Sequence, residues 1–485
     1  MVFSSLIFLY AFLPLSLIAY KLAKGVRGQN RALLVFSLIF YAWGEPKYVL
    51  LLMFMALSSW FCALRVEGSR RDREARFWVF LSSAVDLLLI GFFKYAGFFC
   101  SIFHYSSPFI SSIALPLGIS FYTFQLMTYV IDVYRGEAPA QKSYGDVLLY
   151  AALFHQCIAG PIVRYKTVSQ ELFVRRDSTY TLLPGIRRFT VGLAKKTLLA
   201  NPCGALADSL FLAPAVASDA SLYSQNMEAL KGLTVSGSWL GLLAFSLQIY
   251  LDFSAYSDMA IGLGKMIGLN YAENFDYPYI SRSVTEFWRR WHISLGTFFR
   301  DYVYIPLGGS RCSRARGLFN ALVVWLLTGL WHGASWNFVL WGLYFFVFLM
   351  LERLFLSRWL KRSHFFSRVY LLLVVCLGWV LFHFTDIRLG LTVFRNLLGL
   401  NGNAFTDMIS KILLQNNAFL LLASVLACTP VFRRMGEKLE TLREVPGLSV
   451  LYHVVADCVL PIALLLLATC CLVGDSYNPF IYFQF

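Results

Sequence analysis

Long apolar runs separated by short polar loops repeat along almost the whole chain. Because a helix needs about 20 apolar residues to cross a bilayer, this pattern predicts an all-α polytopic membrane protein. The short segments of alternating polarity that are typical of an outer-membrane barrel are absent. We expect about eleven crossings, within two of that number. The first 65 residues supply three spans, and the others lie near residues 77–99, 114–134, 145–162, 186–211, 237–251, 254–270, 318–351, 368–386, 413–431 and 450–474.

The basic residues indicate how the chain is oriented in the membrane. The first apolar run precedes Lys21, Lys24 and Arg27, which is the reverse of a secretory signal peptide, so we expect an uncleaved span with an external N-terminus. The sequence GEPK at 44–47 turns the chain between two further short spans. The positive-inside rule places the most basic loops in the cytoplasm. These loops are 65–76, 164–176, 353–368 and 432–444.

Composition narrows the class of protein further. Of the 485 residues, 58% are hydrophobic and only 14% are charged, whereas about 25% are charged in a typical soluble domain. The net charge of +15 is explained by the positive-inside rule, and no nucleic-acid-binding pattern accompanies it. The ten cysteines lack C-x-x-C spacing and most lie in or beside apolar runs, so we expect neither a disulfide framework nor a metal site.

We expect a single integral membrane domain over residues 1–485, with one unusual segment inside it. Residues 271–316 mix arginine with tryptophan, phenylalanine and tyrosine. This segment is too polar to cross lipid and too aromatic for an ordinary loop, which favours interfacial or re-entrant helices. Pro306 and the pair Gly308–Gly309 should interrupt any helix there.

The strongest candidate for chemistry is His332, in the sequence TGLWHGAS. As one helix, residues 318–351 would be about 50 Å long, against a hydrocarbon core of about 30 Å. We therefore expect a break where Gly329 and Gly333 flank the histidine, and a broken helix at membrane depth must be buried in protein or line a cavity. An imidazole there is suited to proton transfer. The structural alternative is a buried histidine bonded to a carbonyl group.

A second candidate is His292, in the sequence FWRRWHISL. The adjacent Arg289 and Arg290 could bind phosphates or a carboxylate, and the alternative is a basic aromatic belt at the membrane interface. His155 also lies in an apolar run, before a Gly-Pro pair, but a structural role is favoured for it.

Two carboxylates, Asp252 and Asp258, lie inside an apolar stretch. They could bind a substrate hydroxyl or a cation, but pairing with a buried arginine is the favoured interpretation. The final residues, SYNPFIYFQF, form an aromatic tail at 476–485. Tyr482 in this tail could accept an acyl group, and an interfacial anchor is the alternative.

Several of these stretches together resemble the membrane-bound O-acyltransferases. The likeness is carried by LTGLWHGASWNFVLWG, by WRRWHISL within 271–316, by YLDFSAYSDMAIGLGKMIG, by IAGPIVRY and by the N-terminal run. The combination is most similar to the alginate O-acetylation branch of that family. One departure is Phe154-His155, where relatives tend to have Phe-Pro.

The resemblance implies a ring of transmembrane helices around a tunnel with a thin centre. It implies that His332 is catalytic and that His292 is the second histidine of the site. The expected donor is acetyl-CoA in the cytoplasm of a bacterium, and the protein lies in the inner membrane. The acetyl group is expected to reach an exported polysaccharide through a periplasmic partner of the SGNH-hydrolase type. The tail is similar to the C-terminal motif of a peptide partner in teichoic-acid D-alanylation, which implies that Tyr482 carries the acyl group.

On this hypothesis His332 deprotonates the acceptor hydroxyl, and His292 positions a reactant or shares the proton. Arg289 and Arg290 would hold the CoA phosphates at the cytoplasmic mouth. We place five other residues along the substrate path, namely Trp331, Trp336, Asn337, Asp252 and Trp288.

Three alternatives remain open at the level of sequence. The acceptor could be peptidoglycan, cellulose or another envelope glycan. A polysaccharide or acyl-group transporter without chemistry would also use broken helices and buried charges, although no internal repeat is found. A noncatalytic assembly scaffold is the third class.

Overall fold

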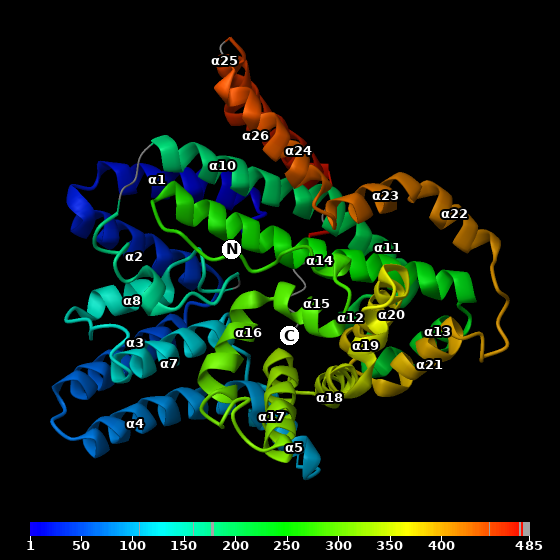
Figure 1. Ribbon diagram of the computed structural model, residues 1–485, viewed down its shortest axis with the longest axis horizontal. Helices are drawn as coiled ribbons and strands as arrows, with labels where there is room; N and C mark the ends of the chain where they lie inside the picture. Colours follow the sequence, from blue (N-terminus) through cyan, green and yellow to red (C-terminus); the bar gives the residue numbers. More distant parts are fainter. Residues whose placement is uncertain (106, 159, 176–178, 446, 475–476, 479–485) are drawn as a thin grey trace. The chain divides into compact units, whose positions relative to one another are not determined.

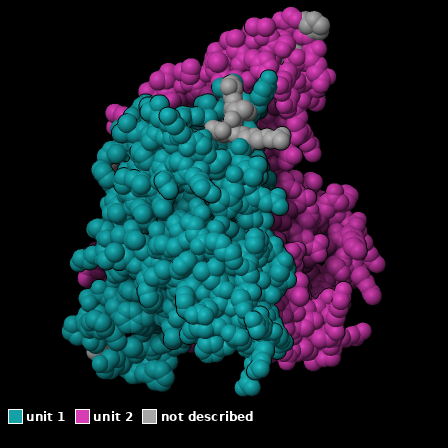
Figure 2. Space-filling view, turned by 90° about the vertical axis from the view of Figure 1, so that its left-hand side faces the viewer, with its two compact units in different colours: residues 1–191, 256–273 teal, residues 192–255, 274–485 magenta. Residues whose placement is uncertain are grey.

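The computed structural model describes residues 1–105, 107–158, 160–175, 179–445, 447–474 and 477–478. Within these ranges the chain forms helices and turns and no strand, which confirms the all-α prediction (Figure 1). The helices form two compact units (Figure 2). Unit 1 comprises residues 1–191 and 256–273, and unit 2 comprises residues 192–255 and 274–485.

Unit 1 is built mainly from the N-terminal helices. Helices α3, α4 and α7 pack against one another, and α8 packs against α2 and α3. The expected turn at GEPK is confirmed, because α2 ends at Gly44 and α3 begins at Val49. The helices are α1 Leu13–Leu22, α2 Gly25–Gly44, α3 Val49–Gly68, α4 Asp72–Ile90, α5 Ala96–Ile102, α6 Pro108–Ser111, α7 Ile119–Tyr134, α8 Tyr144–Ala152, α9 Tyr165–Val168 and α10 Thr179–Ala194, whose last turn belongs to unit 2.

Unit 2 contains the segments that carry both candidate histidines. Its helices are α11 Asn201–Phe211, α12 Pro214–Ala217, α13 Tyr223–Lys231, α15 Val284–Arg290, α16 Ile293–Phe299, α17 Arg314–His332, α18 Trp336–Leu351, α19 Ser357–Leu360, α20 His364–His383, α21 Ile387–Leu397, α22 Met408–Asn416, α23 Ala418–Ala427, α24 Val431–Glu440, α25 Leu448–His453 and α26 Leu460–Gly474. Helix α14, Val235–Met266, contributes to both units. Wider π-helical turns join several helices end to end, among them η3 Lys195–Ala200, η6 Arg300–Tyr304 and η7 Glu352–Leu356.

Among the described residues, five helical segments are long and apolar enough to cross a membrane. Two further pairs of helices would each form a bent span, with angles of 115° between α13 and α14 and 57° between α22 and α23. These helices fit a multi-pass membrane protein, and the number of crossings stays a prediction. The five segments are Val49–Gly68, Asp72–Ile102, Trp336–Leu360, His364–His383 and Leu448–Gly474.

Some predicted boundaries are wrong. Two spans were expected at 237–251 and 254–270, but α14 runs unbroken through this region. The carboxylate of Asp252, which lies between the two expected spans, forms a buried ion pair with Lys196 at 2.7 Å and is thereby neutralised within the helix. The span expected at 145–162 is also too long, since α8 ends at Ala152 and the following residues form a buried turn.

Candidate active site

His332 lies at the short break between two consecutive helices that pack tightly against each other. Helix α17 ends at His332 and α18 begins at Trp336, so the break expected around the histidine is confirmed. The two helices pack against each other, and glycines lie at their contact. A Cβ atom on Gly329 would lie 2.3 Å from the Phe338 carbonyl oxygen, and one on Gly342 would lie 2.4 Å from that of Trp325. Only glycine allows this backbone contact, which fixes the position of His332.

The imidazole of His332 is buried among aromatic rings and is 7% exposed. Its centroid lies 4.9 Å from that of Trp331, 5.0 Å from that of Trp341 and 5.2 Å from that of Phe382. Rings on several sides exclude bulk water, and in such a dry site an electrostatic contact or proton transfer is stronger than in water.

The second candidate histidine, His292, lies beside the Trp331 indole, which also contacts His332. The centroid of His292 lies 5.7 Å from that of Trp331, which itself contacts His332. His292 is 2% exposed and is the residue that precedes α16. It lies outside the apolar spans, and burial lowers the pKa of its imidazole to about 3, so the ring is neutral at physiological pH. Two buried imidazoles therefore contact one tryptophan.

The other residues predicted along the substrate path occupy different settings. Trp288, Trp325 and Trp341 form an aromatic wall, in which the centroid of Trp288 lies 4.9 Å from that of Trp325 and 5.4 Å from that of Trp341. Asn337 is buried, and its amide donates a 3.1 Å hydrogen bond to the Leu381 carbonyl. Trp336 is 54% exposed at the start of α18, so it is not part of the buried wall.

Both candidate carboxylates are paired. Asp252 binds Lys196 as described above, and Asp258 lies 2.6 Å from the guanidinium of Arg188. Arg188 also contacts Glu273 at 2.6 Å. The expected pairing is therefore confirmed for both carboxylates, but the expected arginine is the partner of Asp258 only, because Asp252 pairs with a lysine. His155 is buried beside Tyr271 in unit 1, with 3.5 Å between its Nδ1 and the phenol oxygen.

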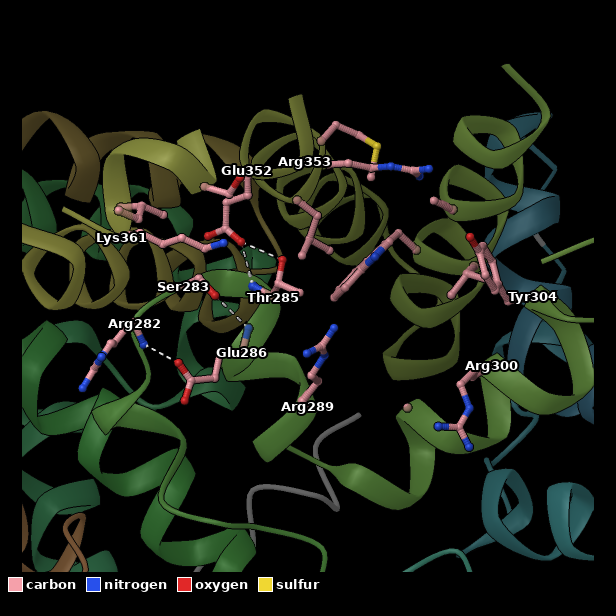
Figure 3. Close-up of a pocket in the computed structure, with 18 of the residues that line it drawn as sticks. Arg282, Ser283, Thr285, Glu286, Arg289, Arg300, Tyr304, Glu352, Arg353 and Lys361 are labelled. Atoms are coloured by element: carbon pink, nitrogen blue, oxygen red, sulfur yellow. Dashed lines mark hydrogen bonds between the residues drawn. The ribbon is translucent and has the colours of Figure 1, made fainter. Parts of the chain in front are cut away.

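A cavity of about 920 Å³ opens beside the aromatic wall in unit 2 (Figure 3). Its lining comes from α15, α16, η6, α17, α18 and the segment that follows α18. Arg289 lines this cavity. Arg290 does not, because it pairs with Asp276 at 3.3 Å and with Glu286 at 2.9 Å. The basic side chains of the lining are Arg282, Arg289, Arg300, Arg353 and Lys361.

The helix that presents Arg289 and Trp288 is held by a residue that the sequence reasoning missed. Glu352 is 2% exposed, and its carboxylate accepts hydrogen bonds from Val284 N at 2.6 Å and Thr285 N at 2.9 Å. The Thr285 hydroxyl donates a third bond at 2.7 Å. A carboxylate at a helix N-terminus satisfies unpaired N–H groups and complements the helix dipole. The available signal was an acidic residue directly after a long uncharged run.

Helix α17 both lines the cavity and ends at His332. Trp325 lines the cavity and lies seven positions before His332, which corresponds to about 10 Å along a helix. Trp341 spans this interval, since its centroid lies 6.3 Å from that of Trp325 and 5.0 Å from that of His332. The inner wall of a basic cavity is therefore two helical turns from the candidate base.

The aromatic tail is described only in part. Tyr482 lies outside the described residues. The Tyr477 hydroxyl donates a 2.6 Å hydrogen bond to Asp208, and the Asn201 amide donates to the Tyr477 carbonyl at 3.2 Å. Both partners belong to α11, so this helix binds the chain at Tyr477. The described residues contain no group of three or more His, Cys, Asp or Glu that could hold a metal ion.

A polytopic helical protein with two buried histidines and a basic cavity beside them has the features of a membrane enzyme that transfers groups. Residues 140–394 match the membrane-bound O-acyltransferase family, and the chain belongs to this family of acyltransferases. It is 40% identical over 397 residues to a Pseudomonas aeruginosa protein described as "Probable alginate O-acetylase AlgI", covering 80% of this chain and 73% of the relative.

Other relatives act on different envelope polymers. The peptidoglycan O-acetyltransferase of Helicobacter pylori is 30% identical over 476 residues, covering 89% of this chain and 87% of the relative. The teichoic acid D-alanyltransferase of Bacillus subtilis is 26% identical over 257 residues, covering 51% of this chain and 60% of the relative.

Proposed function

We propose that this protein is an O-acetyltransferase of the bacterial inner membrane. It takes acetyl groups from cytoplasmic acetyl-CoA and moves them across the membrane for O-acetylation of an exported polysaccharide. The observation that carries the proposal is the juxtaposition of His332 and His292 at Trp331, beside a basic cavity. The family supplies the reaction class, and the structure supplies candidate groups for each role.

In the proposed reaction His332 acts as the general base. It accepts the proton of the acceptor hydroxyl as that oxygen attacks the thioester carbonyl. The new C–O bond forms, the C–S bond breaks, and the proton passes to the departing CoA thiolate, so the overall transfer consumes no proton. The aromatic rings around His332 keep water away from the thioester and so limit its hydrolysis.

The cavity is suited to the anionic part of the donor. Arg289, Arg353 and Lys361 line it, and guanidinium and ammonium groups bind phosphate strongly. Arg353 and Lys361 belong to the basic stretch 353–368, which joins two candidate spans and which the positive-inside rule places at the cytoplasmic side, where CoA is found. A CoA bound with its phosphates at these residues would direct its pantetheine arm along Trp325 and Trp341 toward His332.

Exported polysaccharide is the favoured acceptor, and alginate is the favoured example. The relatives described as alginate O-acetylases are about 40% identical to this chain, against 30% for the peptidoglycan O-acetyltransferase. We propose that a periplasmic partner of the SGNH-hydrolase type completes the transfer, so that the glycan meets this chain only indirectly. Peptidoglycan or cellulose is the alternative acceptor.

Inverted membrane vesicles that carry the protein should release free CoA from acetyl-CoA, faster than vesicles from cells without it. With a labelled acetyl group, the label should be recovered in covalent, base-labile form on the protein or on lumenal glycan, because the proposed reaction forms oxygen esters. Label that enters the lumen without release of CoA thiol would contradict an acetyltransferase and favour a transporter. Comparing the acetyl content of exported polysaccharide with that of peptidoglycan in cells identifies the acceptor.

Arg289 and Arg290 provide a matched test of the donor site. We expect Arg289→Ala to raise KM for acetyl-CoA about tenfold, because losing one charge-assisted phosphate contact costs about 1.4 kcal/mol. Arg290→Ala should leave this KM nearly unchanged, since its guanidinium is paired with Asp276 and Glu286. Steady-state kinetics of vesicles at matched protein levels measures both values. Equal effects of the two substitutions would remove the cavity as the phosphate site.

A further inference from the structure

Asn274 forms a network of hydrogen bonds at the start of α16. It is fully buried, and its backbone carbonyl accepts a 3.0 Å hydrogen bond from Ile293 N. Its side-chain oxygen Oδ1 accepts from Ser294 N at 3.1 Å and from the Ser294 hydroxyl at 2.9 Å. Nδ1 of His292 lies 3.3 Å from the same Oδ1 atom. One amide oxygen therefore faces three polar groups of the segment that carries His292.

These contacts determine which nitrogen of His292 bears the proton. A backbone N–H can only donate, so the Asn274 atom opposite Ser294 N must be the amide oxygen and not the NH2 group. Because an amide oxygen can only accept, Nδ1 of the neutral imidazole must be the donor in its contact with Oδ1. A neutral ring carries one N–H, so Nε2 is left with its lone pair.

The backbone of His292 has a strained conformation, which its surroundings stabilise. Its φ is +47°, in the left-handed region that a residue with a side chain adopts only with steric strain. The bonds from Ile293 N to Asn274 O and from Gly296 N to His292 O, at 3.0 and 3.1 Å, keep the turn in place. Strained residues of this kind persist where the surrounding structure fixes them, and they cluster at functional sites.

The remaining nitrogen of this ring, Nε2, is not used for a structural contact among the described residues. Nε2 of His292 is buried and has no hydrogen-bond partner in the part of the chain that the structure describes. A buried acceptor without a partner is costly unless a ligand supplies the donor. The ring contacts Phe253 at 4.8 Å and Trp331 at 5.7 Å, and Trp331 contacts His332.

We propose that Asn274 is a positioning residue that holds His292 in the Nδ1–H tautomer, so that Nε2 accepts the hydrogen bond of a reacting hydroxyl or thiol. This inference rests on the proposed acetyl transfer for its functional consequence, but the tautomer itself does not depend on that reaction. His292 thereby has a role distinct from that of His332, because one nitrogen is committed to orientation and the other to a reactant.

The tautomer can be measured directly. Solid-state NMR of the protein in bilayers, with ¹⁵N-labelled histidine and a His292→Gln sample for assignment, should show a protonated Nδ1 and an unprotonated Nε2 for His292. Asn274→Asp keeps an acceptor oxygen and should preserve this signature, whereas Asn274→Leu should abolish it. A protonated Nε2 in the wild type would overturn the proposal, whatever substrate the enzyme uses.

Kinetics then tests whether the tautomer matters. Asn274→Leu should lower kcat for acetyl transfer about tenfold or more with little change in KM for acetyl-CoA, and Asn274→Asp should restore most of kcat. In a His292→Gln background Asn274→Leu should cause no further loss, because the residue acts through His292. A further loss of the same size there, or equal loss in the Asp and Leu variants, would show a merely structural role and contradict the proposal. If the wild type transfers no acetyl group, the proposed function fails while the NMR result still decides the tautomer.

Discussion

The His332→Gln variant is expected to lose acetyl transfer by about 10²- to 10⁴-fold, the range that a positioned general base contributes. Glutamine keeps the approximate size of the side chain and can form hydrogen bonds, but it cannot take up a proton near neutral pH. The site around this residue is closed by Trp331, Trp341 and Phe382, so water has poor access to replace the lost base. The release of CoA by vesicles and the acetyl content of exported polysaccharide should fall together.

His383 offers a matched control for this substitution. It is also buried in unit 2, at the end of α20, and its Nε2 lies 3.1 Å from the Leu212 carbonyl oxygen. This is the structural role that was the alternative for His332. His383→Gln should therefore lower stability or membrane level while activity per folded molecule is largely kept. Normal acetylation by His332→Gln, or equal specific loss in both variants, would return His332 to a structural role and favour a scaffold.

The parts of the fold that could be predicted from the sequence follow from length and local chemistry. An uncharged run too long for one span had to break, and the glycines beside His332 marked the place. GEPK likewise marked the turn between α2 and α3. In both cases the deciding residues are neighbours in sequence, so that no knowledge of distant contacts was needed.

The errors and omissions come from contacts between distant residues. Two spans were expected where α14 is one helix, and Lys196, which neutralises Asp252 inside that helix, belongs to another helical segment. The role of Glu352 could not be predicted either, because its carboxylate binds the N-terminus of α15, which is distant in sequence. Neither pairing is encoded in local periodicity, which reports which face of a helix is apolar and not what lies opposite it.

The surroundings of two adjacent arginines, Arg289 and Arg290, could not be predicted from the sequence either. In a helix, consecutive residues point in directions about 100° apart, so Arg289 and Arg290 cannot face the same surroundings. The sequence offers both as phosphate ligands, whereas the structure gives the cavity to Arg289 and acidic partners to Arg290. The direction of a side chain depends on where the helix begins, and here Ser283 caps α15 through its hydrogen bond with Glu286 N at 3.0 Å.

The Tyr482→Phe variant is expected to abolish O-acetylation of the exported polysaccharide, with a loss of about 10²-fold or more. If Tyr482 carries the acetyl group, its phenol oxygen is the atom that attacks the thioester, and phenylalanine lacks that atom while keeping the ring. In the wild type, mass spectrometry of the C-terminal peptide should show an acetyl group on Tyr482 that hydroxylamine removes. The acetylated peptide should disappear in the His332→Gln variant, because the phenol would no longer lose its proton.

Tyr477→Phe is the matched control, because it removes the same hydroxyl five residues earlier in the tail. That hydroxyl donates to Asp208, so its loss should loosen the attachment of the tail to α11 and cost about 1 kcal/mol of binding, which corresponds to roughly a fivefold decrease in activity. An acetyl carrier predicts a far larger loss at Tyr482 than at Tyr477. Equal, modest losses at the two positions would identify the tail as an aromatic anchor only. Full activity of Tyr482→Phe with inactive His332→Gln would keep the histidine chemistry and require the acceptor hydroxyl to come from another molecule.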